Sequence, residues 1–295
     1  MDSWIEQCGD QEVQKACNLQ RCVQVEWEDG LLAKFSYIWL RDNARRRPSL
    51  IHLDLNTRPE GIKCSKEALE VQWPPFVASK YTSSFLRENA LQNNFFNTTS
   101  QLFNKAETSN SSKAGKQRHS ILDSKMSSLD ESLVLGTCYW EDYAQEPGTV
   151  WPHLSSVPSI VAIETLNGPA HISIVDTCKA LSQLRERSPE EFDFLANSVL
   201  EYNGGPYRSR HSICSVDEDG NIQPGVFNNA SRSSTITVKS LDRLYESLQK
   251  FGRICAENTQ ILSLFPGQRL LFNNREGMLG VPAQKGRLLM LKCFS

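Results

Sequence analysis

The chain has 295 residues, of which 39% are hydrophobic and 22% charged, and its formal net charge is −2. This composition is typical of a soluble globular protein of one or two domains, and a near-neutral charge argues against nucleic acid or a membrane surface as partner. No apolar run approaches the ~18 residues that a membrane helix needs. The acidic start of the chain is unlike a secretory or transit peptide, so we expect a cytoplasmic protein, or a mitochondrial one if the N-terminus is incomplete.

The cysteines predict free thiols rather than a disulfide framework or a metal cluster. There are nine of them, an odd number at irregular spacing, and none forms a CxxC pair. Such a pattern is typical of a protein kept in a reducing compartment.

Residues 21–90 predict a small β-rich domain after an N-terminal extension at 1–20. Val23, Val25 and Trp27 alternate with polar residues up to the turn pair Asp29-Gly30, as in a half-buried strand that ends in a hairpin. The strands expected in this domain are 21–30, 31–40 and 68–73.

Residues 91–132 predict a polar, disordered linker. Within 104–132, eight of the 29 residues are serine and large apolar side chains are sparse. A segment of this kind buries too little surface to offset its ordering entropy.

Residues 133–295 predict a domain of strands with a few covering helices, which suggests a β-sandwich or a barrel. Ser188, Pro189 and Glu191 form a capping-box pattern at the start of a short helix, in which Phe192 and Leu195 face inward. The other expected elements are strands at 158–166, 171–176, 261–265 and 269–272, helices at 176–187 and 239–257, and a hairpin that turns at 217–221.

Two short motifs in the N-terminal half admit a functional reading. His52-Leu53-Asp54 is an H-x-D, whose first and third residues would share one face of a strand, as in a non-haem iron centre. Arg45–Arg47 is a basic run that could bind phosphate or nucleic acid. A surface role is the better interpretation of both, because motifs of three residues match by chance.

Two motifs in the C-terminal half carry groups suited to ligand binding. Asn228, Asn229 and Arg232 could hold a carboxylate by hydrogen bonds and charge, although asparagines also favour turns. Tyr202 and Tyr207 flank a glycine turn and could cage a quaternary ammonium group, with a loop of packing aromatics as the preferred alternative.

Taken in order, these segments resemble the γ-butyrobetaine hydroxylase branch of the iron(II)/2-oxoglutarate dioxygenases. The resemblance covers about 21–85 and 157–280, and it is specific in Tyr37–Asn43 (YIWLRDN) and Phe227–Ser233 (FNNASRS). It implies a mainly β fold with helices (α+β), in which a small β domain precedes an incomplete double-stranded β-helix, or jelly roll. It also implies an oxidoreductase of carnitine biosynthesis that uses iron(II), 2-oxoglutarate and ascorbate. Asn228 would then contact the carboxylate of a γ-butyrobetaine-like small-molecule substrate, and a homodimer is left open.

The metal-binding positions of that family are occupied by other residues here. The zinc cysteines that follow LRDN are replaced by Ala44–Pro48, so we expect no zinc. The iron-binding H-x-D falls on Leu154 and Ser156, with His153 one residue out of register, and the distal histidine falls on Leu279. Arg287 is not at the spacing of the arginine that holds 2-oxoglutarate.

Three hypotheses follow from the sequence. The chain is an active dioxygenase of this branch; or it is a catalytically inactive member, such as a splice or gene-model variant, that acts at most as a binding protein; or, most weakly, it is an RNA-binding β protein. The ligand positions predict no stoichiometric iron, no metal ligands and no turnover of 2-oxoglutarate, since imidazole and carboxylate supply such a site. The catalytic residues stay unassigned.

Overall fold

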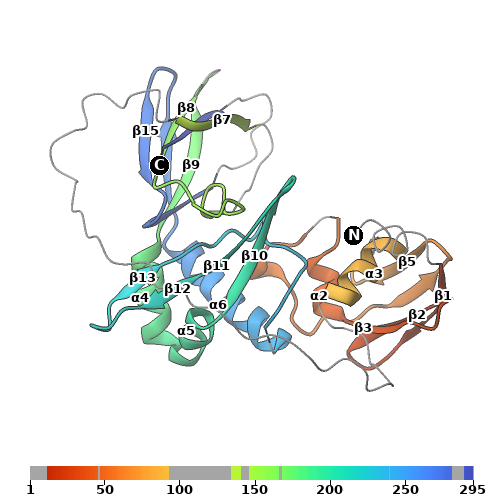
Figure 1. Cartoon of the computed structure of the whole chain (residues 1–295). Helices are drawn as coiled ribbons and strands as arrows, with labels where there is room; N and C mark the ends of the chain where they lie inside the picture. The colour runs from red at the N-terminus through yellow and green to blue at the C-terminus, as the bar shows by residue number, and fades with distance from the viewer. Residues whose placement is uncertain are drawn as a thin grey trace.

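The computed structural model describes residues 12–45, 47–92, 134–140, 146–165, 168–238, 240–280 and 289–294. The predicted linker therefore lies outside the described residues from position 93 onward, as do Arg46 and Arg287. Figure 1 shows an N-terminal unit with its own sheets beside a larger unit in which helices lie below a second group of strands.

The N-terminal unit consists of two three-stranded antiparallel sheets, ordered β1-β2-β3 and β4-β5-β6. Its elements are β1 (Val13–Asn18), β2 (Cys22–Trp27), β3 (Leu32–Ser36), α2 (Tyr37–Asp42), η1 (Leu50–His52), β4 (Gly61–Cys64), β5 (Ala68–Trp73), β6 (Val77–Thr82) and α3 (Ser83–Gln92). The alternation of Val23, Val25 and Trp27 is confirmed, because all three side chains are fully buried. The expected boundary at residue 21 is wrong: β1 pairs along β2 and covers what would otherwise be an open strand edge.

The second half of the expected strand 31–40 is a helix instead. Strand β3 ends at Ser36, whose side-chain oxygen accepts a hydrogen bond from the Trp39 backbone N–H at 3.2 Å and so caps α2. Trp39 then packs on the rings of Phe35 and Phe85. A run of apolar residues suits a strand and a buried helix equally, and here the cap decides between them.

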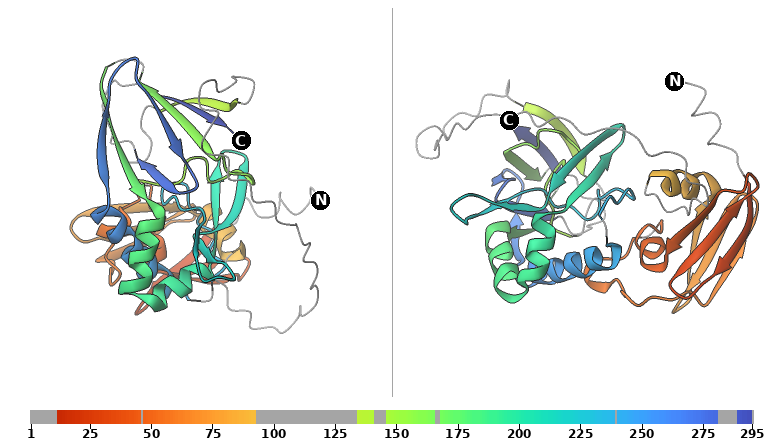
Figure 2. Two further views of the ribbon diagram at one scale, coloured as in Figure 1. Left: turned by 90° about the vertical axis from the view of Figure 1, so that its left-hand side faces the viewer. Right: turned by 60° about the horizontal axis from the view of Figure 1, so that its bottom comes forward.

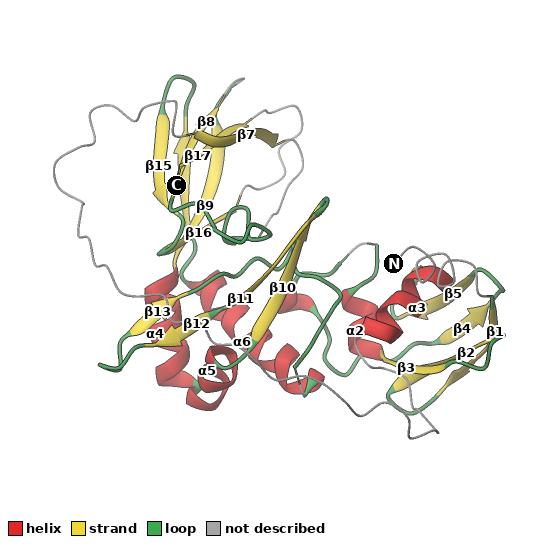
Figure 3. Ribbon diagram, in the orientation of Figure 1, coloured by secondary structure: helices red, strands yellow, loops and turns green. Residues whose placement is uncertain are grey.

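The helices of the C-terminal unit lie where the sequence placed them, as Figure 3 shows in red. They are α4 (Thr177–Arg187), α5 (Pro189–Ala196) and α6 (Leu241–Glu257). Phe192 and Leu195 are buried as expected. The capping box is not formed, because the Ser188 side chain makes no capping hydrogen bond and Glu191 pairs with Lys250 of α6. Because α5 packs against α6, the Glu191 carboxylate pairs with Lys250 and does not take part in a cap.

Two antiparallel sheets, β15-β8-β17-β7 and β14-β9-β16, form the strand layer of this unit. Their strands are β7 (Val134–Trp140), β8 (Ile160–Thr165), β9 (Ala170–Asp176), β14 (Gln260–Leu264), β15 (Arg269–Asn273), β16 (Gly277–Gly280) and β17 (Leu289–Phe294). Two hairpins lie outside these sheets, β10 (Val199–Gly204) with β11 (Tyr207–Ser212) and β12 (Cys214–Val216) with β13 (Ile222–Pro224). A separate apolar cluster with members from both sheets, including Ile163, Ile172 and Leu279, fills the space between them.

The chain alternates between the two sheets as it winds. It passes from β8 to β9, stays in that sheet for β14 after the helices, and then crosses to β15, back to β16 and again to β17. This winding of two facing antiparallel sheets is that of a double-stranded β-helix. Beside β16, the described residues supply only an isolated bridge, Gly148 to Leu279, in place of another strand. The expected fold class, a mainly β protein with helices and an incomplete β-helix, is confirmed.

Figure 2 views the same arrangement from two further sides and shows the β10–β11 hairpin beside the helical layer. The helices found in the described part of the chain are all too short or too polar to cross a bilayer.

Candidate functional site

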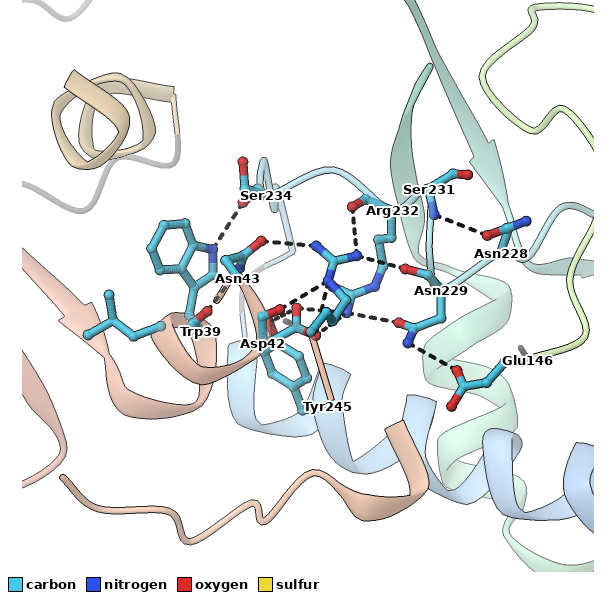
Figure 4. Close-up of polar contacts among 12 residues, drawn as sticks. Trp39, Asp42, Asn43, Glu146, Asn228, Asn229, Ser231, Arg232, Ser234 and Tyr245 are labelled. Atoms are coloured by element: carbon cyan, nitrogen blue, oxygen red, sulfur yellow. Dashed lines mark hydrogen bonds and ion pairs between the residues drawn. The ribbon is translucent and has the colours of Figure 1, made fainter. Parts of the chain in front are cut away.

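The two motifs most specific to the resemblance meet in a buried ion pair. Asp42 ends α2, and Arg232 lies in the loop that follows β13; their side chains are 0% and 1% exposed. One guanidinium nitrogen, Nη2 of Arg232, lies 3.0 Å from Oδ1 and 2.8 Å from Oδ2 of Asp42. Figure 4 shows this contact, which ties the N-terminal unit to the C-terminal one.

Helix α6 supplies the third member of this group. Tyr245, also fully buried, donates a hydrogen bond of 2.8 Å to Oδ2 of Asp42, and its ring lies 5.4 Å from the Arg232 guanidinium carbon. We call Asp42, Arg232 and Tyr245 the interdomain latch. Burial alone would raise the pKa of Asp42, but the charges of Arg232 and Arg47 and the Tyr245 hydrogen bond hold that pKa below its usual range. The same burial, together with the Asp42 charge, raises the pKa of Tyr245.

Arg47 extends the latch and is not the solvated loop residue that the sequence suggested. Its side chain is 21% exposed, and its Nη1 donates to the carbonyl oxygens of Asn229 at 2.7 Å and Arg232 at 3.0 Å. Its Nε donates to the carbonyl oxygen of Asp42 at 3.0 Å. Arg45 is exposed as expected. Arg47 therefore fastens the 229–232 turn to the end of α2, and tertiary contact rather than the local sequence decides its role.

Asn228 lies in the same turn, buried and hydrogen-bonded within the protein. Its Nδ2 donates to the Thr149 carbonyl at 3.0 Å, and its Oδ1 accepts from the Ser231 N–H at 3.0 Å. A Cβ at Gly148 would lie 2.9 Å from the Asn228 Cγ, so the glycine permits this close approach. One amide hydrogen of Asn228 is left for a ligand, and its contact with a substrate carboxylate stays a prediction.

Asn229 continues the chain of contacts toward the β-helix. Its Nδ2 donates to Oε2 of Glu146 at 3.2 Å, and its Oδ1 accepts from Arg232 Nη2 at 3.2 Å. Glu146 precedes the bridge residue Gly148, which pairs with Leu279 on β16. The latch is thus linked by hydrogen bonds to the place where the resemblance puts the metal.

The positions expected to hold iron do not carry suitable donors. Leu279 is 1% exposed and belongs to the apolar cluster between the two sheets. Leu154 is half-buried and Ser156 is exposed. An alkyl chain cannot donate to iron, and a 2-His-1-carboxylate site needs imidazole and carboxylate groups. Within the described residues no group of three His, Cys, Asp or Glu side chains could hold a metal ion.

The histidine that neighbours these positions is held elsewhere. The His153 ring stacks on Tyr207 with a centroid distance of 6.2 Å, and burial lowers the pKa of His153. A Cβ at Gly204 would lie 2.3 Å from that ring, so the β10–β11 hairpin lies directly against one side of it. His153 therefore packs against this hairpin.

The H-x-D motif at 52–54 and the pair Tyr202 and Tyr207 do not form the arrangements that a binding role would need. His52 ends the short helix η1 rather than lying on a strand, and both His52 and Asp54 are exposed. Asp54 accepts a hydrogen bond from the Asn56 N–H at 2.9 Å, as in an Asx turn. Tyr202 is fully buried while Tyr207 is 59% exposed, so the two do not form one cage.

A cavity of about 240 Å³ opens beside the expected iron positions. Its wall combines polar and apolar groups, and its lining residues are Thr149, Ser155, Ser156, Val157, His211, Pro224, Gly225, Val226, Asn274 and Arg275. We call it the Ser156 cavity. Its link to the latch is Thr149, whose carbonyl accepts from Asn228.

Two titratable or charged side chains line the Ser156 cavity. Nε2 of His211 lies 2.9 Å from the Leu154 carbonyl oxygen and 2.8 Å from the Ser209 hydroxyl oxygen. The other ring nitrogen, Nδ1, makes no hydrogen bond within the described part of the chain. Arg275 is exposed at the mouth. Sequence reasoning missed this cavity and also the roles of Asp42 and Tyr245; only the position of Asp42 inside YIWLRDN hinted at one of them.

No family model matches the chain. It is similar to the solved structure of an asparagine oxygenase in complex with Fe(II), 2S,3S-3-hydroxyasparagine and succinate, with 12% identity, a TM-score of 0.42 and coverage of 52% of this chain and 50% of that one. It is also similar to a taurine dioxygenase from Burkholderia xenovorans, with 16% identity, a TM-score of 0.40 and coverage of 54% and 63%. A putative α-ketoglutarate-dependent taurine dioxygenase from the same organism has 13% identity and a TM-score of 0.41, with coverage of 58% of this chain and 62% of that one. The chain spans between half and less than two thirds of the length of these proteins.

Proposed function

We propose that this chain is a non-catalytic relative of γ-butyrobetaine hydroxylase that binds a small carboxylate and does not activate oxygen. The observation that carries the proposal is the side chains at the expected iron positions, Leu154, Ser156 and Leu279. Leu279 matters most, because its alkyl chain packs inside the β-helix with 1% exposure.

The scaffold of that branch supports this relationship. Tyr37–Asn43 and Phe227–Ser233, the two motifs that carry the resemblance, contribute Asp42 and Arg232 to one buried ion pair. The strands behind them wind as a double-stranded β-helix. This ion pair involves none of the expected metal positions, so it does not depend on the metal ligands.

The Ser156 cavity is the binding site in this proposal. Arg275 supplies a positive charge at its mouth, and a guanidinium pairs well with a carboxylate. The hydroxyls of Ser155 and Ser156 and the Nδ1 of His211 supply further polar groups, while Val157 and Val226 give an apolar wall. Such a mixture of a few polar groups on an apolar wall suits a small organic acid. Its volume of about 240 Å³ accommodates a molecule of the size of γ-butyrobetaine.

The test combines metal analysis, turnover and binding on the purified full chain. After incubation with Fe(II) and anaerobic desalting, we expect no stoichiometric iron, and with 2-oxoglutarate, ascorbate and γ-butyrobetaine we expect neither succinate nor carnitine. Calorimetry should show saturable binding of γ-butyrobetaine, weakened about tenfold by Arg275→Gln, since a charge-assisted hydrogen bond is removed. Arg269→Gln is the matched control, because Arg269 on β15 pairs with Glu164 on β8 and does not line the cavity. Carnitine formation by iron-loaded protein, or equal affinities for both variants, would refute the proposal.

A gain of metal binding tests the assigned positions themselves. The variant Leu154→His/Ser156→Asp/Leu279→His installs two imidazoles and one carboxylate at the positions that the resemblance indicates. If these positions are correct, the triple variant should bind Co(II) with a visible absorption band, and the Ser156→Asp single variant should not. Circular dichroism checks that the introduced polar group at Leu279 leaves the fold intact.

A further inference from the structure

A second cavity, of about 280 Å³, lies between the N-terminal unit and helix α6. Segments from four places in the chain line it: the turn between β1 and β2, the start of α2, residues 55–58, and the first turn of α6. The lining residues are Gln20, Arg21, Ser36, Tyr37, Ile38, Leu55, Asn56, Thr57, Arg58 and Asp242. We call it the Arg58 cavity, and it shares no residue with the Ser156 cavity.

The charges of this cavity favour an anion. Arg21 and Arg58 are positive, and Asp242 is the single acidic residue of the lining. Asp242 is already paired with Arg21 at 2.9 Å, with side chains 53% and 70% exposed. Arg58 makes no ion pair within the described part of the chain, so one positive charge remains uncompensated.

The charge of Arg58 is felt by Tyr37 in the wall of the cavity. Burial raises the pKa of the neighbouring Tyr37, and the positive charge of Arg58 opposes that rise. The Tyr37 hydroxyl is itself hydrogen-bonded to Asn18 and to the Leu19 carbonyl, which keeps the ring fixed in the wall. The Arg58 side chain is itself exposed, so its guanidinium can turn toward an oxyanion that lies against this fixed surface.

The rest of the lining indicates what the anion is attached to. Ile38 is 5% exposed and Leu55 is half-buried, which gives the cavity an apolar floor. Thr57, Asn56 and Gln20 add neutral hydrogen-bonding groups near the rim. A bare ion would leave the apolar part unused, whereas a short hydrocarbon body would cover it.

We infer that the Arg58 cavity is a second binding site, which takes a small organic oxyanion, a carboxylate or phosphate on a short apolar body, with Arg58 as its charged contact. The site depends on tertiary structure, because α6 contributes Asp242 from more than 180 residues away from Arg58 in sequence. Asp242 competes with the ligand for Arg21, and its removal should strengthen binding.

The experiment is a calorimetric titration of the full chain with phenyl phosphate and with hexanoate, which separate the two oxyanion classes, and with 1-hexanol as the uncharged comparison. We expect saturable binding of at least one anion and none of the alcohol. Arg58→Gln should weaken that binding about tenfold. Asp242→Asn should strengthen it about two- to fivefold, because Arg21 is then available to the anion. The gain is small because the exposed Arg21–Asp242 pair is itself weak.

Two control variants separate this site from the surface and from the Ser156 cavity. Arg45→Gln removes an exposed arginine outside both cavities and should leave the affinity within twofold. Arg275→Gln removes the charge of the Ser156 cavity and so reports any part of the binding that occurs there. The inference is overturned if neither anion saturates, if Arg58→Gln and Arg45→Gln behave alike, or if Asp242→Asn weakens binding. If Arg275→Gln abolishes binding and Arg58→Gln does not, the anion binds in the Ser156 cavity and the inference is wrong.

Discussion

The interdomain latch predicts a large stability loss from a change of one atom in Asp42. Asp42→Asn keeps the shape of the side chain but replaces a carboxylate oxygen by an NH2 group. Arg232, 1% exposed, would then keep a buried charge without its counter-ion, and Tyr245 would lose the acceptor 2.8 Å away. Removing one partner of a buried ion pair costs about 3–5 kcal/mol, so we expect a loss of that size in the free energy of unfolding.

Urea denaturation followed by circular dichroism measures this loss. At an m value of about 3 kcal/mol/M, the midpoint should fall by about 1 M or more. The matched control is Asp242→Asn, which removes an exposed carboxylate from a surface pair with Arg21 and should cost less than about 1 kcal/mol. A loss for Asp42→Asn no larger than that of the control would refute the reasoning.

The second variant that tests the latch removes both charges. Asp42→Leu combined with Arg232→Met removes both ions of the fully buried pair, and buried pairs replaced by apolar residues are often neutral or stabilising. Arg47 also loses the Asp42 carboxylate, but its side chain is 21% exposed and keeps its carbonyl partners at Asn229 and Arg232. The double variant should therefore be more stable than Asp42→Asn alone. If it is less stable, Arg232 contributes through contacts other than the pair, such as its hydrogen bond to Asn229.

Further predictions concern pH, helix caps and glycines. Since the pKa of Asp42 is lower in the folded state, its stabilisation is complete above the unfolded value of about 3.9 and is lost as the pH falls through the folded pKa; unfolding curves should show this acid-dependent loss in the wild type and not in Asp42→Asn. Ser240→Ala should cost about 1 kcal/mol, because Ser240 caps α6, whereas Ser188→Ala should cost little, because Ser188 makes no cap; thermal melts compare them. Gly225→Ala should cost more than about 2 kcal/mol, since its Cβ would lie 2.1 Å from a backbone oxygen, and Gly61→Ala, with open space, should stay within about 1 kcal/mol.

Much of the local structure could be read from the sequence. Val23, Val25 and Trp27 gave a correct strand because alternation follows directly from the two-residue repeat of a strand. Helix α6 was equally clear from its apolar spacing. The expected strand at 31–40 failed because an apolar run does not distinguish a strand from a buried helix, and the capping contact of Ser36 is a matter of backbone geometry.

The sequence by itself predicted the segments and their order, and it has Leu154, Ser156 and Leu279 at the positions where the resemblance expects metal ligands. These are properties of residue type at a position, so no fold is needed to state them. Tertiary structure alone decided that the half-buried Arg47 joins the 229–232 turn to the end of α2 and that Asp42 meets Arg232, 190 residues later. It also assembled both cavities, each from segments distant in sequence. The physical reason is that burial and Coulomb energy depend on the distances between side chains that the fold brings together. The order of residues along the chain does not specify these distances.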